Sequence, residues 1–300
     1  MRVVVCLPEG GQPWAEALQA ALPEAQVQWW QPGAEQADFA LIWQPPEAFF
    51  AEQTQLKAVF GAGAGVDAFV ERVPPTLPLY RTEDAGMGAL MAEYLLYALL
   101  RWHRQFDRYD THERWEPLPA QKREDWTVGV LGCGVLGRQV ARAAQQLGFP
   151  VRGWVRTPRE DAEIPLCAGL DALPDFLAGT RVLVALLPLT AATRGLLNAE
   201  RFAQLPPGAC FVNLARGGLV VQEDLLAALD SGHLHAAQLD VTSPEPLPPE
   251  HPFWRHPRIR LTPHVAALTP RAAAVAQIAD KMRRLARGEA VSGRVGPEGY

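Results

Sequence analysis

Three segments of the chain carry a polar side chain just beyond a short apolar run. "ACFVNLARGGLV" contains Arg216 before two glycines, "AAQLDVTSPEPLP" contains Glu245 between two prolines, and "RIRLTPHVAAL" contains His264. The apolar runs are typical of strands that end at Asn213, at Asp240 and at His264 itself. Taken singly, Arg216 can be a surface cation, Glu245 a loop or helix-cap acid, and His264 a hydrogen-bonded structural histidine. Open α/β sheets bind ligands beyond the carboxyl ends of their strands, so the joint placement favours a site.

These three side chains form a working set for the reduction of a 2-oxo acid, provided that a nicotinamide binds beside them. An arginine can hold the carboxylate or polarise the ketone. A histidine can give a proton to the oxygen as hydride reaches the carbon. A glutamate can hold the imidazole and favour its charged form.

A glycine-rich turn provides the place for a dinucleotide. "TVGVLGCGVLGRQVARAAQQLGFPVRGWV" holds Gly132, Gly134 and Gly137 in G-x-G-x-x-G spacing, after an apolar strand and before a helix and a second strand. Gly132 permits the tight turn, Gly134 lets the backbone approach a pyrophosphate, and Gly137 lets helix and strand pack closely. The N–H groups of the helix N-terminus then face the phosphates. Such glycines can also serve packing alone, but the strand–turn–helix–strand order favours dinucleotide binding.

The second strand of this unit ends without the acid that would bind the adenosine ribose of NAD. That acid is expected about 20 residues after the first glycine, but Val155 ends the strand, and Arg156, Thr157 and Arg159 follow it. Arginine has fork geometry that suits a phosphate. The pattern therefore predicts a pocket for the ribose phosphate of NADP, the alternative being a solvated basic loop.

A further glycine-rich segment, "VFGAGAGVDAFV", follows an expected strand at 56–60. Its spacing lacks the helix-opening form of the first turn. Exposed backbone N–H groups of Gly63, Ala64 and Gly65 can hold a small carboxylate. The alternative is a flexible turn. If the segment faces Arg216 and His264, it completes a site for a 2-oxo acid.

Short apolar runs alternate with helical patterns through most of the chain, which predicts parallel sheets covered by helices. A long helix is expected from about Gly88 to about Asp107, and segment 108–126 is typical of an arm or linker. A last helix follows the second alternating block, with Thr269 as its cap, Pro270 in its first turn and Gly288 at its end. In the first block, strands are expected at 2–7, 26–30, 38–43, 56–60 and 77–81, and a helix at 13–22.

The predicted fold class is α/β, with two Rossmann-like or flavodoxin-like domains, mostly parallel sheets and an active-site cleft between them. Residues 1–87 plus 271–300 form a discontinuous substrate domain, because the last helix is expected to return to the first block. Residues 88–270 form the dinucleotide-binding domain.

Composition limits the other classes of function. The net charge of −5 gives no general attraction to nucleic acid or to an anionic membrane. The 4 cysteines show no CxxC pair, so neither a zinc site nor a disulfide framework is expected, and a reducing cytoplasm is favoured. The N-terminal apolar run is too short for a signal peptide, and no run reaches membrane-spanning length.

The ordered set of motifs resembles the D-isomer-specific 2-hydroxyacid dehydrogenase family over essentially the whole chain. The matching motifs are "GAGVD", "VGVLGCGVLG", "LLPLTAATRGLLN", "FVNLARGGLV", "LDVTSPEPLP" and "LTPHVAALT". Within the family, the chain is most similar to the glyoxylate/hydroxypyruvate reductase A type. That similarity is carried by "LIWQPP", "YRTEDAGMGALMAEY", "FDRYDTHERWEPLP" and the C-terminal "VSGRVGPEGY".

The resemblance implies NADPH-dependent reduction of glyoxylate or hydroxypyruvate, with NADH as a possible second cofactor, and a homodimer with a dimerisation arm near 105–126. Arg216, Glu245 and His264 would be the catalytic set, and Asp240 would contact the nicotinamide amide. Val135 stands where many members carry an arginine, so that contact to the pyrophosphate is not carried over. The substrate would meet Trp43, Ala64, Gly65, Arg216 and His264, and the cofactor would meet Gly132, Gly134, Val135, Leu136, Gly137, Arg156, Thr157, Arg159, Leu187, Pro188, Thr193, Ala215 and Asp240.

Two alternatives stay open at this point. One is a related dehydrogenase for a larger 2-oxo acid, which Trp43 in the pocket would disfavour. The other is a nucleotide-sensing binding protein without turnover, against which the joint presence of Arg216, Glu245 and His264 argues.

Overall fold

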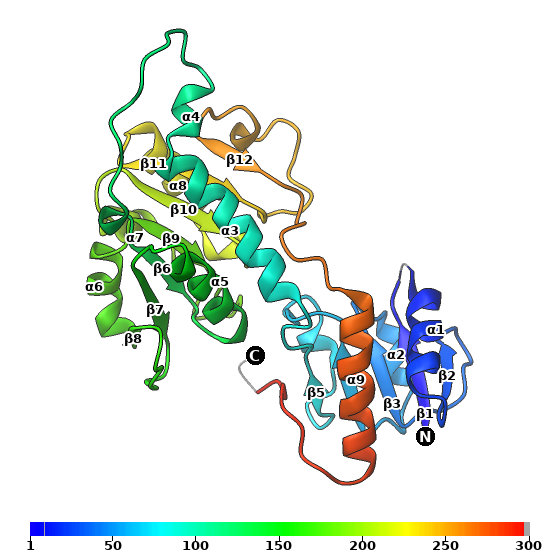
Figure 1. The fold of residues 1–300 in the computed structure, drawn as a ribbon. Helices are drawn as coiled ribbons and strands as arrows, with labels where there is room; N and C mark the ends of the chain where they lie inside the picture. The colour runs from blue at the N-terminus through cyan, green and yellow to red at the C-terminus, as the bar shows by residue number, and fades with distance from the viewer. Residues whose placement is uncertain (9, 297–300) are drawn as a thin grey trace. The chain divides into compact units, whose positions relative to one another are not determined.

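The computed structural model describes residues 1–8 and 10–296, which form two compact units (Figure 1). Unit 1 comprises Met1–Gly86 and Thr269–Tyr300, and unit 2 comprises Met87–Leu268. The last four residues of the C-terminal motif, 297–300, and Glu9 of the N-terminal segment lie outside the described residues. Within the described chain, no helix is both long and apolar enough to cross a membrane.

Unit 1 is built on a five-stranded parallel sheet with the order β2-β1-β3-β4-β5, the flavodoxin-like order. Helices α1 and α9 pack on one face, and α2 packs on the other. Alternate residues of β1 serve the two faces: Val3 and Val5 meet α1 and α9, whereas Val4 and Cys6 meet α2. The elements are β1 Arg2–Cys6, α1 Gly11–Ala21, β2 Gln26–Trp29, β3 Phe39–Ile42, α2 Glu47–Glu52, β4 Ala58–Gly61, β5 Leu79–Tyr80 and α9 Arg271–Ala286.

The start of α9 differs from the prediction. Its N-cap is Pro270 rather than Thr269. Pro270 has an extended backbone, so the helix begins one residue later than predicted, at Arg271. Its end agrees with the prediction, since Gly288 follows the last turn with φ +79°, a conformation that favours glycine.

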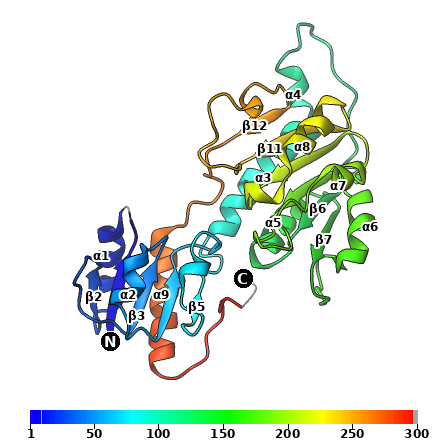
Figure 2. The same ribbon diagram turned by 180° about the vertical axis from the view of Figure 1, so that it is seen from behind.

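Unit 2 is built on a seven-stranded parallel sheet with the order β12-β11-β10-β9-β6-β7-β8. Read from β8, this is the Rossmann order 3-2-1-4-5-6 with one further strand, β12, at the edge. Helices α3 and α5 cover one face, and α6, α7 and α8 cover the other (Figures 1 and 2). The α/β class with two parallel sheets is therefore confirmed. The elements are α3 Met87–His103, α4 Phe106–Tyr109, β6 Val128–Leu131, α5 Val135–Gln146, β7 Val151–Val155, β8 Leu166–Ala168, α6 Leu173–Ala178, β9 Val182–Ala185, α7 Ala199–Ala203, β10 Ala209–Asn213, α8 Gln222–Asp230, β11 Leu234–Leu239 and β12 Ile259–Leu261.

The long helix expected to reach Asp107 is interrupted. Helix α3 ends at His103, and Gln105 takes a left-handed conformation with φ +58° before the short helix α4 begins at Phe106. The Gln105 amide also donates to the carbonyl of Pro119, at 2.6 Å, and this bond ties the break to the following loop. Beyond α4, residues 110–122 form a loop that projects from unit 2 (Figure 1).

Candidate active site

The three polar side chains of the sequence motifs follow three neighbouring strands. β10, β11 and β12 are adjacent and parallel, so their carboxyl ends share one edge of the sheet. The expected strand ends need two corrections. β11 ends at Leu239, one residue before Asp240, and β12 ends at Leu261, three residues before His264. His264 itself has φ +55°, which no strand residue adopts, so it belongs to the loop.

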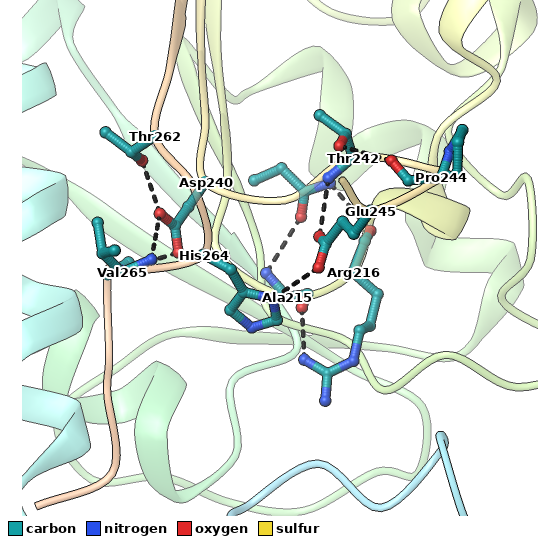
Figure 3. Close-up of polar contacts among 11 residues, drawn as sticks. Ala215, Arg216, Asp240, Thr242, Pro244, Glu245, Thr262, His264 and Val265 are labelled. Carbon is teal, nitrogen blue, oxygen red and sulfur yellow. Dashed lines mark hydrogen bonds and ion pairs between the residues drawn. The ribbon is translucent and has the colours of Figure 1, made fainter. Parts of the chain in front are cut away.

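Glu245 and His264 form a direct pair. The Glu245 carboxylate lies 2.9 Å from Nδ1 of His264. Because an ionised carboxylate only accepts hydrogen bonds, Nδ1 is the donor and Nε2 lies on the opposite edge of the ring. The second carboxylate oxygen of Glu245 accepts the backbone N–H of Thr242 at 3.0 Å. The Glu245 carboxylate, itself held by the backbone of the Glu245 loop, therefore orients the imidazole of His264 (Figure 3).

The loop that carries Arg216 is fixed by a buried amide and by a close backbone approach. Asn213, only 1% exposed, donates to the carbonyl of Arg216 at 3.0 Å and accepts the N–H of Ala215 at 3.1 Å. A Cβ at Gly217 would overlap the backbone of Thr242, so only glycine lets this loop lie against the loop of Glu245. Figure 3 shows Arg216, Glu245 and His264 together, with the Arg216 guanidinium also bonded to the carbonyl of Ala215, at 2.7 Å.

The side chain of Asp240 holds the loop of His264 through hydrogen bonds. Its side chain is 2% exposed and accepts three hydrogen bonds: from the Thr262 hydroxyl at 2.6 Å and from the N–H groups of Val265 and Ala266, both at 2.8 Å. Its carbonyl accepts the N–H of His264 at 2.8 Å. These bonds offset the cost of the left-handed backbone at His264.

The glycine-rich turn has the shape that a pyrophosphate needs. Gly132 has φ +106°, and a Cβ there would lie 2.6 Å from the backbone of Leu186; a Cβ at Gly137 would overlap the carbonyl of Gly132. Nothing lies within 4 Å of the Cβ position of Gly134, so the space before α5 is open. No side chain caps α5, and the first N–H groups of a helix have no acceptor within it. The turn thus fits a dinucleotide phosphate.

The loop after β7 contains the predicted phosphate-binding residues, and all of them are exposed. The Arg159 guanidinium donates to the carbonyl of Cys133, within the glycine-rich turn, so it joins the two loops. Arg138, on α5, makes an ion pair with Asp161 at 2.8 Å, and Asp161 accepts backbone N–H groups of its own loop. The roles of Arg156, Thr157 and Arg159 toward a cofactor stay predictions.

The segment after β9 lies against the same turn. Leu187 is 8% exposed, and the backbone of Leu186 and Leu187 meets the Cβ position of Gly132. The Thr193 hydroxyl donates to the carbonyl of Pro188 at 2.6 Å and accepts the N–H of Thr190 at 2.8 Å, which closes the segment on itself. Leu187, Pro188 and Thr193 are thus placed beside the predicted cofactor turn.

In unit 1, Trp43 lies beside the second glycine-rich loop. A Cβ at Gly63 would meet the Trp43 ring at 3.0 Å, and the ring also packs edge-on against Phe69. Thr82 donates to the carbonyls of Gly61 and Gly63, so the loop is anchored through its acceptors. Substrate binding by Trp43, Ala64 and Gly65, and the expected active-site cleft, stay predictions.

Several supporting residues were missed in the motifs. Asn213, Gln222 and Thr262 all hold loops of the site through side-chain hydrogen bonds. Asn213 was noted only as a strand end. The sequence does contain a signal for two of them. An apolar strand ends in Asn213, and Thr262 stands two residues before His264, so hydrogen-bonding side chains occupy positions where apolar ones are expected.

Comparison with known proteins gives the same family by sequence and by structure. A family model for the NAD-binding domain of D-isomer-specific 2-hydroxyacid dehydrogenases matches residues 94–266. Glyoxylate/hydroxypyruvate reductase A of Klebsiella pneumoniae (strain 342) is 47% identical over 293 residues, which cover 94% of both chains. The chain belongs to the D-isomer-specific 2-hydroxyacid dehydrogenase family.

Several solved structures resemble the whole chain. A D-isomer-specific 2-hydroxyacid dehydrogenase from Xanthobacter autotrophicus Py2, in complex with NADPH and MES, has a TM-score of 0.94 and 41% identity, covering 100% of this chain and 99% of that one. An NADPH-dependent glyoxylate/hydroxypyruvate reductase from Sinorhizobium meliloti, in complex with NADP and sulfate, has a TM-score of 0.92 and 34% identity with the same coverage.

Proposed function

We propose that this protein is an NADPH-dependent reductase of glyoxylate and hydroxypyruvate. The observation that carries the proposal is the pair between Glu245 and His264, at 2.9 Å, in loops beside Arg216 at the edge of a Rossmann sheet. A nucleotide-sensing protein would need no such oriented proton donor. The 47% identity to a glyoxylate/hydroxypyruvate reductase A supports this activity among those of the family.

When bound, the nicotinamide supplies the hydride. The chain supplies the rest of the chemistry. Arg216 holds the carboxylate of the 2-oxo acid or polarises its ketone through charge-assisted hydrogen bonds. His264 delivers a proton from Nε2 to the carbonyl oxygen, because Nδ1 is engaged by Glu245. Glu245 keeps the ring in that orientation.

The residues of unit 2 that would hold the cofactor fit NADPH. The N-terminus of α5, from Val135 through Leu136 to Gly137, offers backbone donors for the pyrophosphate. Arg156 and Thr157 offer a guanidinium and a hydroxyl to the ribose phosphate, and no acid stands at the end of β7 to repel it. Asp240 is proposed to accept a hydrogen bond from the amide group of the nicotinamide.

The substrate domain is proposed to be unit 1, with the N–H groups of Ala64 and Gly65 as donors to the substrate carboxylate and Trp43 as a wall. A wall of indole disfavours long side chains, so small 2-oxo acids are preferred over larger ones. This ranking separates the proposed reductase from a dehydrogenase of larger 2-oxo acids.

One kinetic comparison tests the proposal. Initial rates are measured with glyoxylate, hydroxypyruvate, pyruvate and phenylpyruvate, each with NADPH and with NADH. The proposal requires kcat/KM to be highest with NADPH and one of the first two substrates. A clear preference for phenylpyruvate would favour the larger-substrate alternative, and no turnover with any of them would favour a sensor.

We also propose that the protein is a cytoplasmic homodimer joined through the projecting arm near 105–126. Trp115 is fully exposed there, and Phe106 and Tyr109 are partly exposed, which is unusual for a face that meets only water. Light scattering after size exclusion should give a dimer for the native chain and a monomer for Trp115→Asp/Phe106→Asp. A monomeric native protein would refute this assembly.

A further inference from the structure

A chain of hydrogen bonds runs from helix α3 to the loop of His264. The amide of Gln238, on β11, donates to the Tyr94 hydroxyl at 2.7 Å. Tyr94, on α3, lies 2.5 Å from the hydroxyl of Thr262. Thr262 donates to the buried carboxylate of Asp240 at 2.6 Å. All four residues belong to unit 2.

The direction of every proton in this chain follows from chemistry. The Asp240 carboxylate only accepts, so the single hydroxyl hydrogen of Thr262 points to it. The bond between Tyr94 and Thr262 must then use the hydrogen of Tyr94. Burial raises the pKa of Tyr94, which keeps that hydrogen in place at neutral pH. The Tyr94 oxygen is left to accept from Gln238, which is itself buried.

This chain ends at the group that shapes the loop of His264. One oxygen of Asp240 accepts both the Thr262 hydroxyl and the N–H of Val265 (Figure 3), and the other oxygen accepts the N–H of Ala266. His264 lies between Thr262 and Val265 with φ +55°, a backbone conformation that non-glycine residues hold only when their surroundings over-determine it. A shift of the imidazole by about 1 Å can cost a reaction about 100-fold.

We propose that Tyr94 and Thr262 are positioning residues for the proton donor: together with Gln238, they hold the Asp240 carboxylate and thereby the backbone on which His264 stands. The inference rests on the proposed function insofar as His264 delivers a proton. Neither side chain touches the reacting atoms. Tyr94 is the last residue of the motif "YRTEDAGMGALMAEY".

The experiment compares substitutions that remove only a hydroxyl. Tyr94→Phe removes two bonds between neutral groups, from Gln238 and to Thr262, and kcat should fall by about 2- to 10-fold. Thr262→Val removes the bond to the Asp240 carboxylate as well as the bond from Tyr94, so kcat should fall by up to about 100-fold. KM for the 2-oxo acid should change little, and the dissociation constant of NADPH should rise by less than kcat falls, because Asp240 is one of several proposed contacts of the cofactor. Thr262→Ser should retain most of kcat, since it keeps the hydroxyl. Tyr97→Phe, one turn further along α3 at an exposed position, is the matched control and should equal the native protein.

Two further measurements separate positioning from a general loss of stability. The solvent deuterium isotope effect on kcat should rise in Tyr94→Phe and Thr262→Val, because proton delivery becomes slower than the other steps. The double variant should be no worse than Thr262→Val alone, because the two hydroxyls act in series. Fully additive losses, or equal impairment of Thr262→Ser and Thr262→Val, would overturn the proposal.

Amide hydrogen exchange tests the same inference without turnover. The peptide that covers residues 262–268 should exchange faster in Tyr94→Phe, faster still in Thr262→Val, and at the native rate in Tyr97→Phe. If the native protein reduces no 2-oxo acid but this order holds, the proposed function fails and the positioning role stands. If kcat and exchange are both native in Tyr94→Phe and in Thr262→Val, the positioning role fails and the proposed function is untouched.

Discussion

Two loops at the same edge of the seven-stranded sheet are built in opposite ways. The loop after β12, which carries His264, is held by a buried carboxylate with three hydrogen bonds. The loop after β7, which carries Arg156, is exposed from Arg156 to Glu160. It is tied to its surroundings by Arg159 on the carbonyl of Cys133 and by the pair of Arg138 with Asp161.

The difference follows from what each loop is proposed to do. Proton delivery depends steeply on distance and angle, so its group must be held in one place. Recognition of a doubly charged phosphate needs the fork of a guanidinium within reach, and a long side chain at the surface can provide it. Substitutions in the two loops should therefore differ in size, in the kinetic constant that they change and in their response to salt.

The largest effect is expected at His264. In His264→Asn the proton donor is lost while a polar side chain is kept, so kcat should fall by at least about 100-fold. NADPH affinity, measured by fluorescence titration, should remain. Near-native turnover of a folded His264→Asn protein would show that the loop after β12 does not hold the proton donor.

The next effect concerns Arg216. Lysine keeps the charge but loses the planar fork, so Arg216→Lys should lower kcat/KM by about 10- to 100-fold, the worth of one or two charge-assisted bonds. NADPH affinity should be nearly unchanged. A large loss of NADPH affinity with native kcat would move Arg216 from the substrate to the cofactor.

A smaller and more specific effect is expected at Arg156. Arg156→Ala should weaken NADPH binding by about 10- to 40-fold, since an exposed bond to a charged group lies at the low end of its range. The loss should shrink as salt rises, and KM for NADH should barely move. Arg255→Ala, an exposed arginine between β11 and β12, is the control. Equal losses for both cofactors would mean that the loop is merely solvated.

The smallest effect concerns the sheet that supports both loops. His103, at the end of α3, is buried against the rings of Trp126 and Phe149, and this burial, together with the charge of Arg123, lowers its pKa below the ordinary 6.5. Below pH 6.5 the unfolded chain binds a proton first, so stability should fall from there down to the lowered pKa of the folded protein.

Thermal unfolding at several pH values checks this expectation. His103→Phe keeps an aromatic ring but cannot titrate, so it should lose less stability between pH 7.5 and pH 5.5 than the native protein does. His112→Phe makes the same substitution at an exposed site. If the Tm of all three proteins falls by the same amount between pH 7.5 and pH 5.5, the titration of His103 does not determine how thermal stability depends on pH.

Local sequence determined much of this protein. Alternating apolar runs and helical patterns gave the α/β class, and glycine spacing gave the turn before α5, because such features depend on neighbours in the chain. Arg216, Glu245 and His264 were found because each follows a strand, and parallel strands end at one edge. The long helix ends before the predicted Asp107, because no local pattern predicts the left-handed backbone of Gln105, whose amide bonds to the carbonyl of Pro119.

Tertiary structure alone decided how the site is held. Asp240 is 22 residues from Thr262 in the sequence, and Thr262 is 168 residues from Tyr94. No periodicity or spacing links positions so far apart. The pairing of β11 with β12 brings Asp240 to Thr262, and the packing of α3 against the sheet brings Tyr94 to Thr262. β12 ends at Leu261, and the bonds of Asp240 hold the left-handed backbone of His264 that follows. The residue types thus predicted the proton donor and the substrate-binding arginine, whereas long-range hydrogen bonds determined the geometry in which they are held.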